Sequence, residues 1–181
     1  MASALLLILM ALVASVSPAD GETTDPIHVA DCERGPVTIG SGPPNWRARS
    51  ILAGPVAVLR DPLGRMSETA SGQLTAKMPI FVAGHEPVTV SVPPRSRHRV
   101  FLYYGRMRDR EGRPTTIFGR ARGVAEIRFE PCADRPRTVW PGGIRVRGRK
   151  PVRLLVLPDR GDEPIPLRLG RPRAHRAGQD R

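Results

Sequence analysis

The chain contains few cysteine and aromatic residues and has no long stretch without proline. Of its 181 residues, 2 are Cys, 2 Trp, 2 Tyr and 4 Phe, whereas 20 are Pro and 18 are Gly. After the N-terminal segment, the longest stretch without proline runs from Arg95 to Arg113. Because a proline inside a helix costs about 3 kcal/mol, this spacing excludes coiled coils and helical bundles. Gly and Pro have no collagen-like period, and the 40% hydrophobic content is enough for the core of one domain.

The first segment has the pattern of an export signal. A run of apolar and small residues from Leu5 to Val16 is shorter than the roughly 20 residues that span a bilayer. Small residues at Ser17 and Ala19 then predict cleavage after Ala19, so that residues 1–19 form a signal peptide and the mature chain begins at Asp20. A retained membrane anchor is the alternative. The sequence therefore predicts a secreted or cell-envelope protein with no transmembrane segment in the mature chain.

Two cysteines, Cys32 and Cys132, are the whole thiol content of the chain. In an oxidising compartment an even number of cysteines usually means pairing, so we expect a disulfide that closes a loop of about 100 residues. Two free buried thiols are the alternative. Neither cysteine has a second Cys or a His at zinc-ligand spacing, so we expect no metal site and no cofactor.

The mature chain shows the two-residue alternation of β-strands. Val88, Val90 and Val92 alternate with polar residues, and the same period recurs at 125–129, 144–147 and 152–156. Continuous apolar runs at 56–59, 79–82 and 100–104 are typical of central strands. Turn signals lie at 83–86, 109–113, 140–143 and 159–162. We predict an all-β domain over 20–169, an antiparallel β-sandwich of eight or nine strands with a barrel as the alternative, followed by a basic flexible tail over 170–181.

The second half of the chain resembles a group of known proteins. The pattern consists of Phe129-Glu130-Pro131-Cys132, the segment Thr138 to Trp140, Gly142-Gly143-Ile144 and the strand Pro151 to Val156. It is similar to small exported β-rich proteins of high-GC Gram-positive bacteria whose function is unknown. The resemblance implies a secreted β-rich domain and carries no site residues.

Positive charge is concentrated in the second half of the chain. The formal net charge is +12, and lysine contributes only Lys77 and Lys150, so arginine supplies nearly all of the positive charge. Residues 20–94 contain 6 basic and 8 acidic groups, net −2, whereas residues 95–181 contain 23 basic and 9 acidic groups, net +14. Guanidinium groups bind phosphate and carboxylate bidentately. The candidate anion-binding residues are Arg95, Arg97, Arg99, Arg145, Arg147, Arg149, Lys150 and Arg153.

Two interpretations of these arginines are open. Arg145 and Arg147 share one strand face, and Arg153 extends that face if the neighbouring strands pair. Alternatively the face is simply solvated and partly neutralised by Glu126 and Glu130 across the sheet.

Known catalytic motifs do not occur in the chain. His85-Glu86 comes closest to one, but Pro87 follows directly and the pair lies in a predicted turn. With eight aromatic residues the sequence shows no base-stacking platform, which argues against a nucleic-acid partner. Trp46 and Trp140 are the candidates for a carbohydrate platform.

Three functional hypotheses follow. The first is a non-enzymatic exported domain that contacts anionic envelope polymers or lipid head groups. The second is a structural or protein-binding module that meets another surface protein, with incidental charge. The third is a hydrolase whose site is assembled from dispersed residues.

Overall fold

The computed structural model describes residues 27–33, 46–64, 66–69, 71–109, 111–115, 121–161 and 163–172. The predicted signal peptide and most of the predicted tail lie outside these residues. The described residues form strands and one short 3₁₀ helix, η1, Pro94–Ser96. The strands are β1 His28–Ala30, β2 Ser50–Ala53, β3 Val56–Leu59, β4 Ser67–Glu68, β5 Gln73–Lys77, β6 Ile80–Ala83, β7 Val88–Ser91, β8 Val100–Tyr104, β9 Met107–Arg108, β10 Pro114–Thr115, β11 Glu126–Phe129, β12 Arg137–Trp140, β13 Gly142–Arg147, β14 Val152–Pro158 and β15 Ile165–Gly170.

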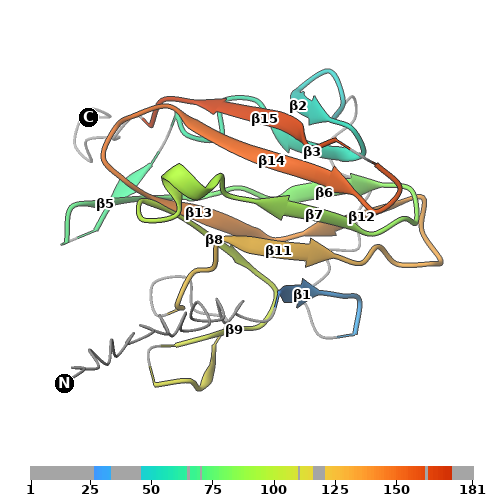
Figure 1. The fold of residues 1–181 in the computed structure, drawn as a ribbon, viewed down its shortest axis with the longest axis horizontal. Coiled ribbons are helices and arrows are strands. Elements are labelled where there is room, and N and C mark those ends of the chain that lie inside the picture. Colours follow the sequence, from blue (N-terminus) through green and yellow to red (C-terminus); the bar gives the residue numbers. More distant parts are fainter. Residues whose placement is uncertain are drawn as a thin grey trace, which may run out of the picture.

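The strands form two packed layers (Figure 1). One layer is a five-stranded sheet in the order β1-β11-β7-β14-β15. The other layer contains two sheets, β12-β6-β3-β2 and β4-β5-β13-β8. These two sheets are joined because β5 continues into β6 and β12 continues into β13, and Met78 donates a backbone hydrogen bond of 2.9 Å to the Gly142 carbonyl at the junction. The sheets in the described residues are open, so the predicted sandwich is confirmed and the barrel alternative is wrong.

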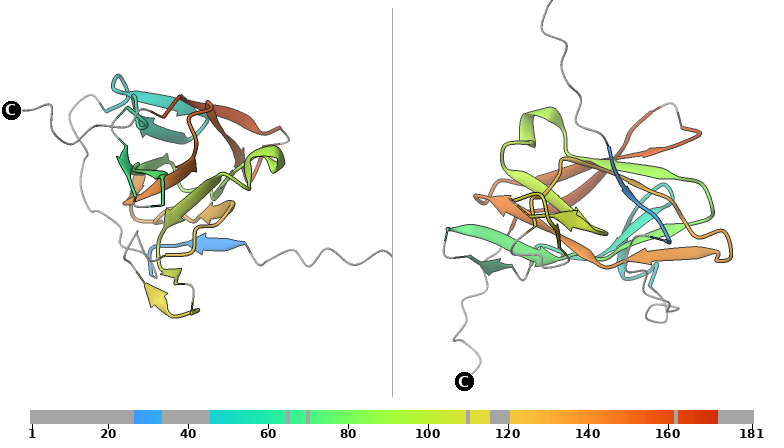
Figure 2. Two further views of the ribbon diagram at one scale, coloured as in Figure 1. Left: turned by 90° about the vertical axis from the view of Figure 1, so that its left-hand side faces the viewer. Right: turned by 90° about the horizontal axis from the view of Figure 1, so that it is seen from below.

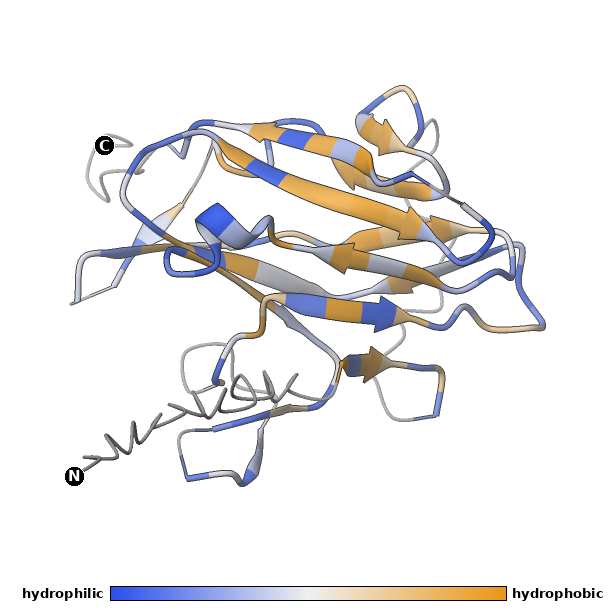
Figure 3. Ribbon diagram, in the orientation of Figure 1, coloured by the Kyte–Doolittle hydropathy of each residue, from blue (hydrophilic) through white to orange (hydrophobic). Residues whose placement is uncertain are grey.

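A single apolar core fills the space between the layers. It contains fully buried side chains from both layers, and hydrophobic residues are concentrated in the strands (Figure 3). Three aromatic rings form a contact chain through it: Tyr104 meets Phe129 edge to face at 5.3 Å, and Phe129 meets Trp140 at 5.1 Å. The Tyr104 hydroxyl donates to the Met78 carbonyl at 2.5 Å, and burial raises the pKa of this phenol well above its usual value. Because Trp140 is inside this core, it cannot serve as a carbohydrate platform.

Several details differ from the sequence prediction. The described chain has fifteen strands rather than eight or nine, because short pieces such as β1, β4 and β9 pair as well. One pair is parallel: β1 runs alongside β11 with Val29 opposite Arg128. The segment 140–143 is extended rather than a turn, since β12 ends at Trp140 and β13 starts at Gly142. The segment 83–86 connects β6 and β7 in opposite layers, whereas 109–113 closes the β9–β10 hairpin that projects from the sandwich (Figure 2).

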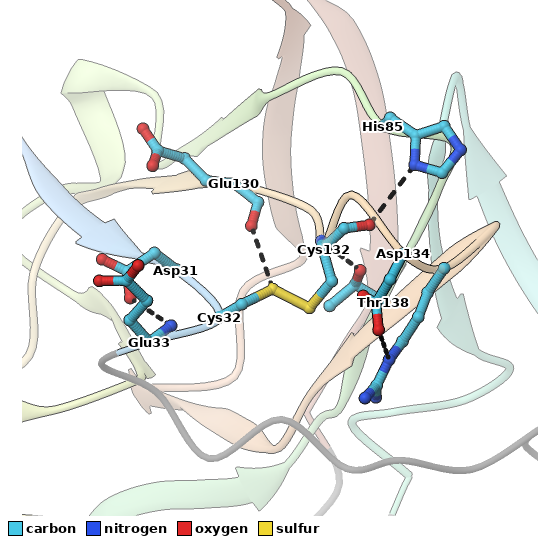
Figure 4. The surroundings of a disulfide bond; sticks show 9 residues. Asp31, Cys32, Glu33, His85, Glu130, Cys132, Asp134 and Thr138 are labelled. Atoms are coloured by element: carbon cyan, nitrogen blue, oxygen red, sulfur yellow. Dashed lines mark hydrogen bonds and ion pairs between the residues drawn. A yellow bond between two sulfur atoms is a disulfide. The ribbon is translucent and has the colours of Figure 1, made fainter.

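Cys32 and Cys132 form a disulfide, as the sequence predicts (Figure 4). Their Cα atoms lie 5.7 Å apart across a sequence separation of 100 residues. Cys32 follows the edge strand β1, and Cys132 follows its parallel partner β11. The loop at Cys132 is held by Thr138, whose hydroxyl oxygen accepts a hydrogen bond of 2.9 Å from the Cys132 amide. The disulfide thus fastens the three-residue edge strand β1, whose parallel ladder with β11 is short.

Among the described residues, no helix has the length and apolar character needed to cross a membrane.

Candidate anion-binding site at one end of the sandwich

Most of the predicted anion-binding residues meet at one end of the sandwich, the left-hand end in Figure 1. There β7 leads into η1, β8 begins, β13 ends and β14 begins. We call this cluster the basic end. It comprises seven predicted residues and two that sequence reasoning missed: Arg95, Arg97, Arg99, Arg147, Arg149, Lys150, Arg153, Arg168 and Arg171.

Arg99 links the two sequence segments that form the basic end. Its guanidinium donates to the carbonyl oxygens of Lys150 at 3.4 Å and Pro151 at 2.5 Å, and its own carbonyl accepts from the Arg147 amide at 2.8 Å. These bonds hold the 148–151 turn against the start of β8. Arg149 and Lys150 therefore lie on a turn that the hydrogen bonds of Arg99 hold in place, and both side chains are exposed.

Arg97 is the member of the basic end that has a carboxylate nearby. Its Nε donates to the Val92 carbonyl at 3.3 Å, and its Nη2 lies 3.9 Å from Glu126 Oε2. Within the described part of the chain this is the one ion pair that the basic end makes. All members except the half-buried Arg99 are exposed, so the positive potential of this end faces solvent.

Arg153 does not extend the Arg145–Arg147 face. The strands β13 and β14 do not pair but lie in opposite layers, and Arg153 faces outward on the five-stranded sheet. Its cross-strand neighbour is Arg168 of β15. Glu126 belongs to β11 in that same sheet and Glu130 directly follows β11, so the predicted neutralisation of Arg145 and Arg147 across a sheet is also wrong.

Arg145 and Arg147 lie on the outer face of the other layer, each over an aromatic ring of β8. The Arg145 guanidinium carbon is 4.7 Å from the Tyr103 ring centre, and that of Arg147 is 5.4 Å from the Phe101 ring centre. Burial raises the pKa of Tyr103, and the charge of Arg145 opposes this shift. Arg147 is exposed and belongs to the basic end, whereas Arg145 is half-buried and packs as part of this face.

A second cluster on the outer face of this layer surrounds Trp46. The indole stacks on Phe81 at 5.5 Å, and the guanidinium carbons of Arg137 and Arg47 lie 4.7 and 5.5 Å from its ring centre. The indole is half-buried, so much of the aromatic surface is already covered by the chain's own arginines. This arrangement gives Trp46 a packing role in place of the open platform that the sequence left possible.

At the opposite end of the sandwich, arginines are paired with acids. Arg128 holds Asp159 bidentately, with Nη1 2.5 Å from Oδ1 and Nη2 2.9 Å from Oδ2, and Arg160 lies 2.8 Å from Glu86. The hydrogen bonds from Arg128 lower the pKa of the Asp159 carboxyl. The charge asymmetry of the folded chain therefore runs along the strands, from a basic end to a neutralised end.

An open depression of about 760 Å³ lies at this neutralised end, between His85, Glu86, Asp159 and Arg160. Its two carboxylates are already engaged by arginines, and the lining residues that the structure describes include no Ser, Thr or Cys. His85 Nδ1 lies 3.4 Å from the Cys132 carbonyl. Because both carboxylates are held by arginines, the arrangement does not favour the hydrolase hypothesis.

Across the described ranges, no group of three or more His, Cys, Asp or Glu side chains is arranged to hold a metal ion. Comparisons with protein-family models, curated proteins and solved structures found no match. The basic end is therefore the candidate site on its geometry and charge alone.

Proposed function

We propose that the chain is an exported β-sandwich protein that binds anionic polymers of the cell envelope through its basic end. The observation that carries this proposal is the convergence of two arginine-rich segments, 95–99 and 147–153, at one end of the fold through Arg99. Exposed guanidinium groups bind phosphate and carboxylate in two-point contacts. A polymer that carries many such groups contacts several arginines at once.

A polymer fits the basic end better than a lipid surface. The exposed large hydrophobic residues of the described chain are Ile27, Val29, Leu52 and Leu157, and none belongs to the basic end. Stable attachment to a lipid surface needs an inserted apolar group beside the charge. Purely electrostatic binding is the mode that this surface supports.

The predicted export signal and the disulfide agree with an extracytoplasmic location. The test is N-terminal sequencing of the protein recovered from the medium or cell wall. Export predicts a mature N-terminus at Asp20, and Leu7→Arg in the apolar run should keep the protein inside the cell. A full-length chain recovered in the cytoplasm contradicts export.

Binding is tested with linear polyphosphate of defined length at increasing salt. The double variant Arg149→Glu/Lys150→Glu changes two exposed groups on the 148–151 turn. Its matched control, Arg106→Glu/Arg122→Glu, changes the net charge equally at exposed positions outside the basic end. At low salt the first variant should lose about tenfold or more in affinity and reduce the slope of log K against log salt by about two.

At about 0.15 M salt, where the Debye length is about 8 Å, the control should change the affinity by less than about twofold. Equal losses in both variants, or binding that does not weaken with salt, contradicts the proposal. Vesicles of anionic lipid serve as a second arm. Tighter binding to these vesicles than to polyphosphate would show that the partner is an anionic membrane surface and not a polymer.

A further inference from the structure

Arg153 and Arg168 lie directly opposite each other on adjacent antiparallel strands. The β14–β15 register pairs them, and a register shift between Val152 and Arg153 brings Gly170, with φ of 80°, opposite Val152. Both arginines are exposed, and each stands between two buried residues of its own strand. Both side chains therefore project from the outer face of the five-stranded sheet.

Like charges in this position oppose folding. Side chains that are directly opposite in an antiparallel pair have Cβ atoms about 4.5–5.5 Å apart, and like charges there are destabilising. At the other end of the same sheet face, the charge of Arg128 is instead paired with the carboxylates of Asp159 and Glu130. In the described residues, neither Arg153 nor Arg168 makes an ion pair with a carboxylate.

A third arginine, Arg97, follows the next strand of the same sheet, β7. The antiparallel β7–β14 register places Ser91, the last residue of β7, opposite Leu155, so β7 ends towards the start of β14 and η1 follows there. Arg97 follows η1 and is tied back to the Val92 carbonyl at 3.3 Å. Arg168 and Arg153 are therefore on the adjacent strands β15 and β14, and Arg97 follows the next strand of the sheet, β7.

We propose that Arg153 and Arg168 form a phosphate-binding subsite in which two guanidinium groups hold one phosphate of the polyanion. The subsite rests on the proposed function and specifies its ligand chemistry. The two oxygens of a carboxylate lie in one plane and suit a single guanidinium, as Asp159 does for Arg128. A phosphate has acceptor oxygens arranged tetrahedrally, so guanidinium groups from two strands reach it together. The bound anion then relieves the repulsion between the two arginines.

The test compares Arg153→Gln, Arg168→Gln and the double variant with the control Arg106→Gln, using inorganic phosphate as the probe and acetate as the carboxylate arm. Without phosphate at low salt, each single variant should have a higher melting temperature than the wild type, because it removes the like-charge contact. Phosphate should raise the melting temperature of the wild type and much less that of either single variant. Each single variant should bind phosphate about tenfold or more weakly, with little further loss in the double variant.

A merely structural role for either arginine predicts the opposite sign, a lower melting temperature on substitution with an unchanged response to phosphate. That result overturns the subsite, as does binding of acetate as tight as that of phosphate. The two proposals fail separately. If the Gln variants match Arg106→Gln while Arg149→Glu/Lys150→Glu still loses polyphosphate, the subsite is wrong and the basic end remains. If the wild type binds neither polyphosphate nor phosphate, both are wrong.

Discussion

The guanidinium of Arg99 donates a 2.5 Å hydrogen bond to the carbonyl oxygen of Pro151. This contact joins two segments about 50 residues apart in sequence and holds the 148–151 turn at the basic end. Arg99 thus acts on the site through the backbone of the turn.

Substitution of Arg99 should distinguish the effect of its charge from its effect on the conformation of the 148–151 turn. Arg99→Gln loses the hydrogen bonds to the Lys150 and Pro151 carbonyls, so we expect a loss of about 1–2 kcal/mol in the free energy of unfolding, measured by urea denaturation. Polyphosphate affinity should fall more than in Arg95→Gln, which removes the same charge at an exposed position in η1. Equal affinities in the two variants would show that the turn does not depend on Arg99.

Loss of the disulfide should destabilise the whole fold. The double variant Cys32→Ser/Cys132→Ser opens a loop with a sequence separation of 100 residues. In the chain-entropy model such a loop is worth about 4–5 kcal/mol, because the open chain has more unfolded conformations. The midpoint of urea unfolding measures the change. A variant with the wild-type midpoint shows that β1 is not needed for the stability of the sandwich.

The ion pair between Arg128 and Asp159 should make stability depend on pH. The hydrogen bonds from Arg128 lower the pKa of Asp159 in the folded chain. The stabilisation that the Asp159 carboxylate gives to the folded state is therefore fully present above the pKa of Asp in an unfolded chain, about 3.9. It is lost as the pH falls through the lower folded value. Asp159→Asn should therefore be less stable than wild type at neutral pH, and the difference should shrink in acid.

Urea midpoints of the wild type and Asp159→Asn across the acid range test this prediction. Asp134→Asn serves as the control, since Asp134 pairs with its sequence neighbour Arg135. A difference between wild type and Asp159→Asn that stays constant with pH would contradict the assigned role of the carboxylate.

Gly142 is required where β12 continues into β13. A Cβ atom there would lie 2.2 Å from Tyr104 Cδ1 and 2.4 Å from the Tyr103 carbonyl oxygen. Gly142→Ala should cost about 3 kcal/mol or more, because backbone and a buried ring must move. Gly148→Ala is the comparison: it has no atom within 4 Å, and its φ of 75° should cost only about 1 kcal/mol. Thermal unfolding of both variants should rank them in this order, and the reverse order contradicts the packing at Tyr104.

This glycine also explains where the sequence prediction of the fold fails. The continuous apolar runs of β3 and β8 match strands that are buried on both faces, and the alternation in β14 matches a strand with one buried and one outer face, so these strands could be predicted. Trp140-Pro141-Gly142-Gly143 has the composition of a turn, yet it is extended because Gly142 packs against Tyr104 of β8. A contact with a distant strand has no local signature. The three-residue strand β1 is similarly set by its pairing with β11 and by the disulfide.

The site was predictable in part. The clusters at 95–99 and 145–150 are evident in the sequence, and their residues other than Arg145 do meet. The layer to which each strand belongs is not encoded locally: the sequence left open that Arg153 extends the Arg145–Arg147 face if the strands pair, and Arg153 lies opposite Arg168 instead. Arg168 was missed because it is a single arginine in an apolar strand. The turn residues at 159–162 do indicate the β14–β15 hairpin in the sequence. The register of this hairpin brings Arg153 and Arg168 together.

The most direct test of the central claim is an NMR titration of the isotope-labelled, oxidised protein with short linear polyphosphate at low salt. Binding at the basic end predicts that backbone amide and arginine Nε–H shifts change at 95–99, 147–153 and 168–171, and that these changes disappear at high salt. Shift changes concentrated instead around Trp46 and Arg137, or spread evenly over all exposed arginines, would contradict a binding site at the basic end.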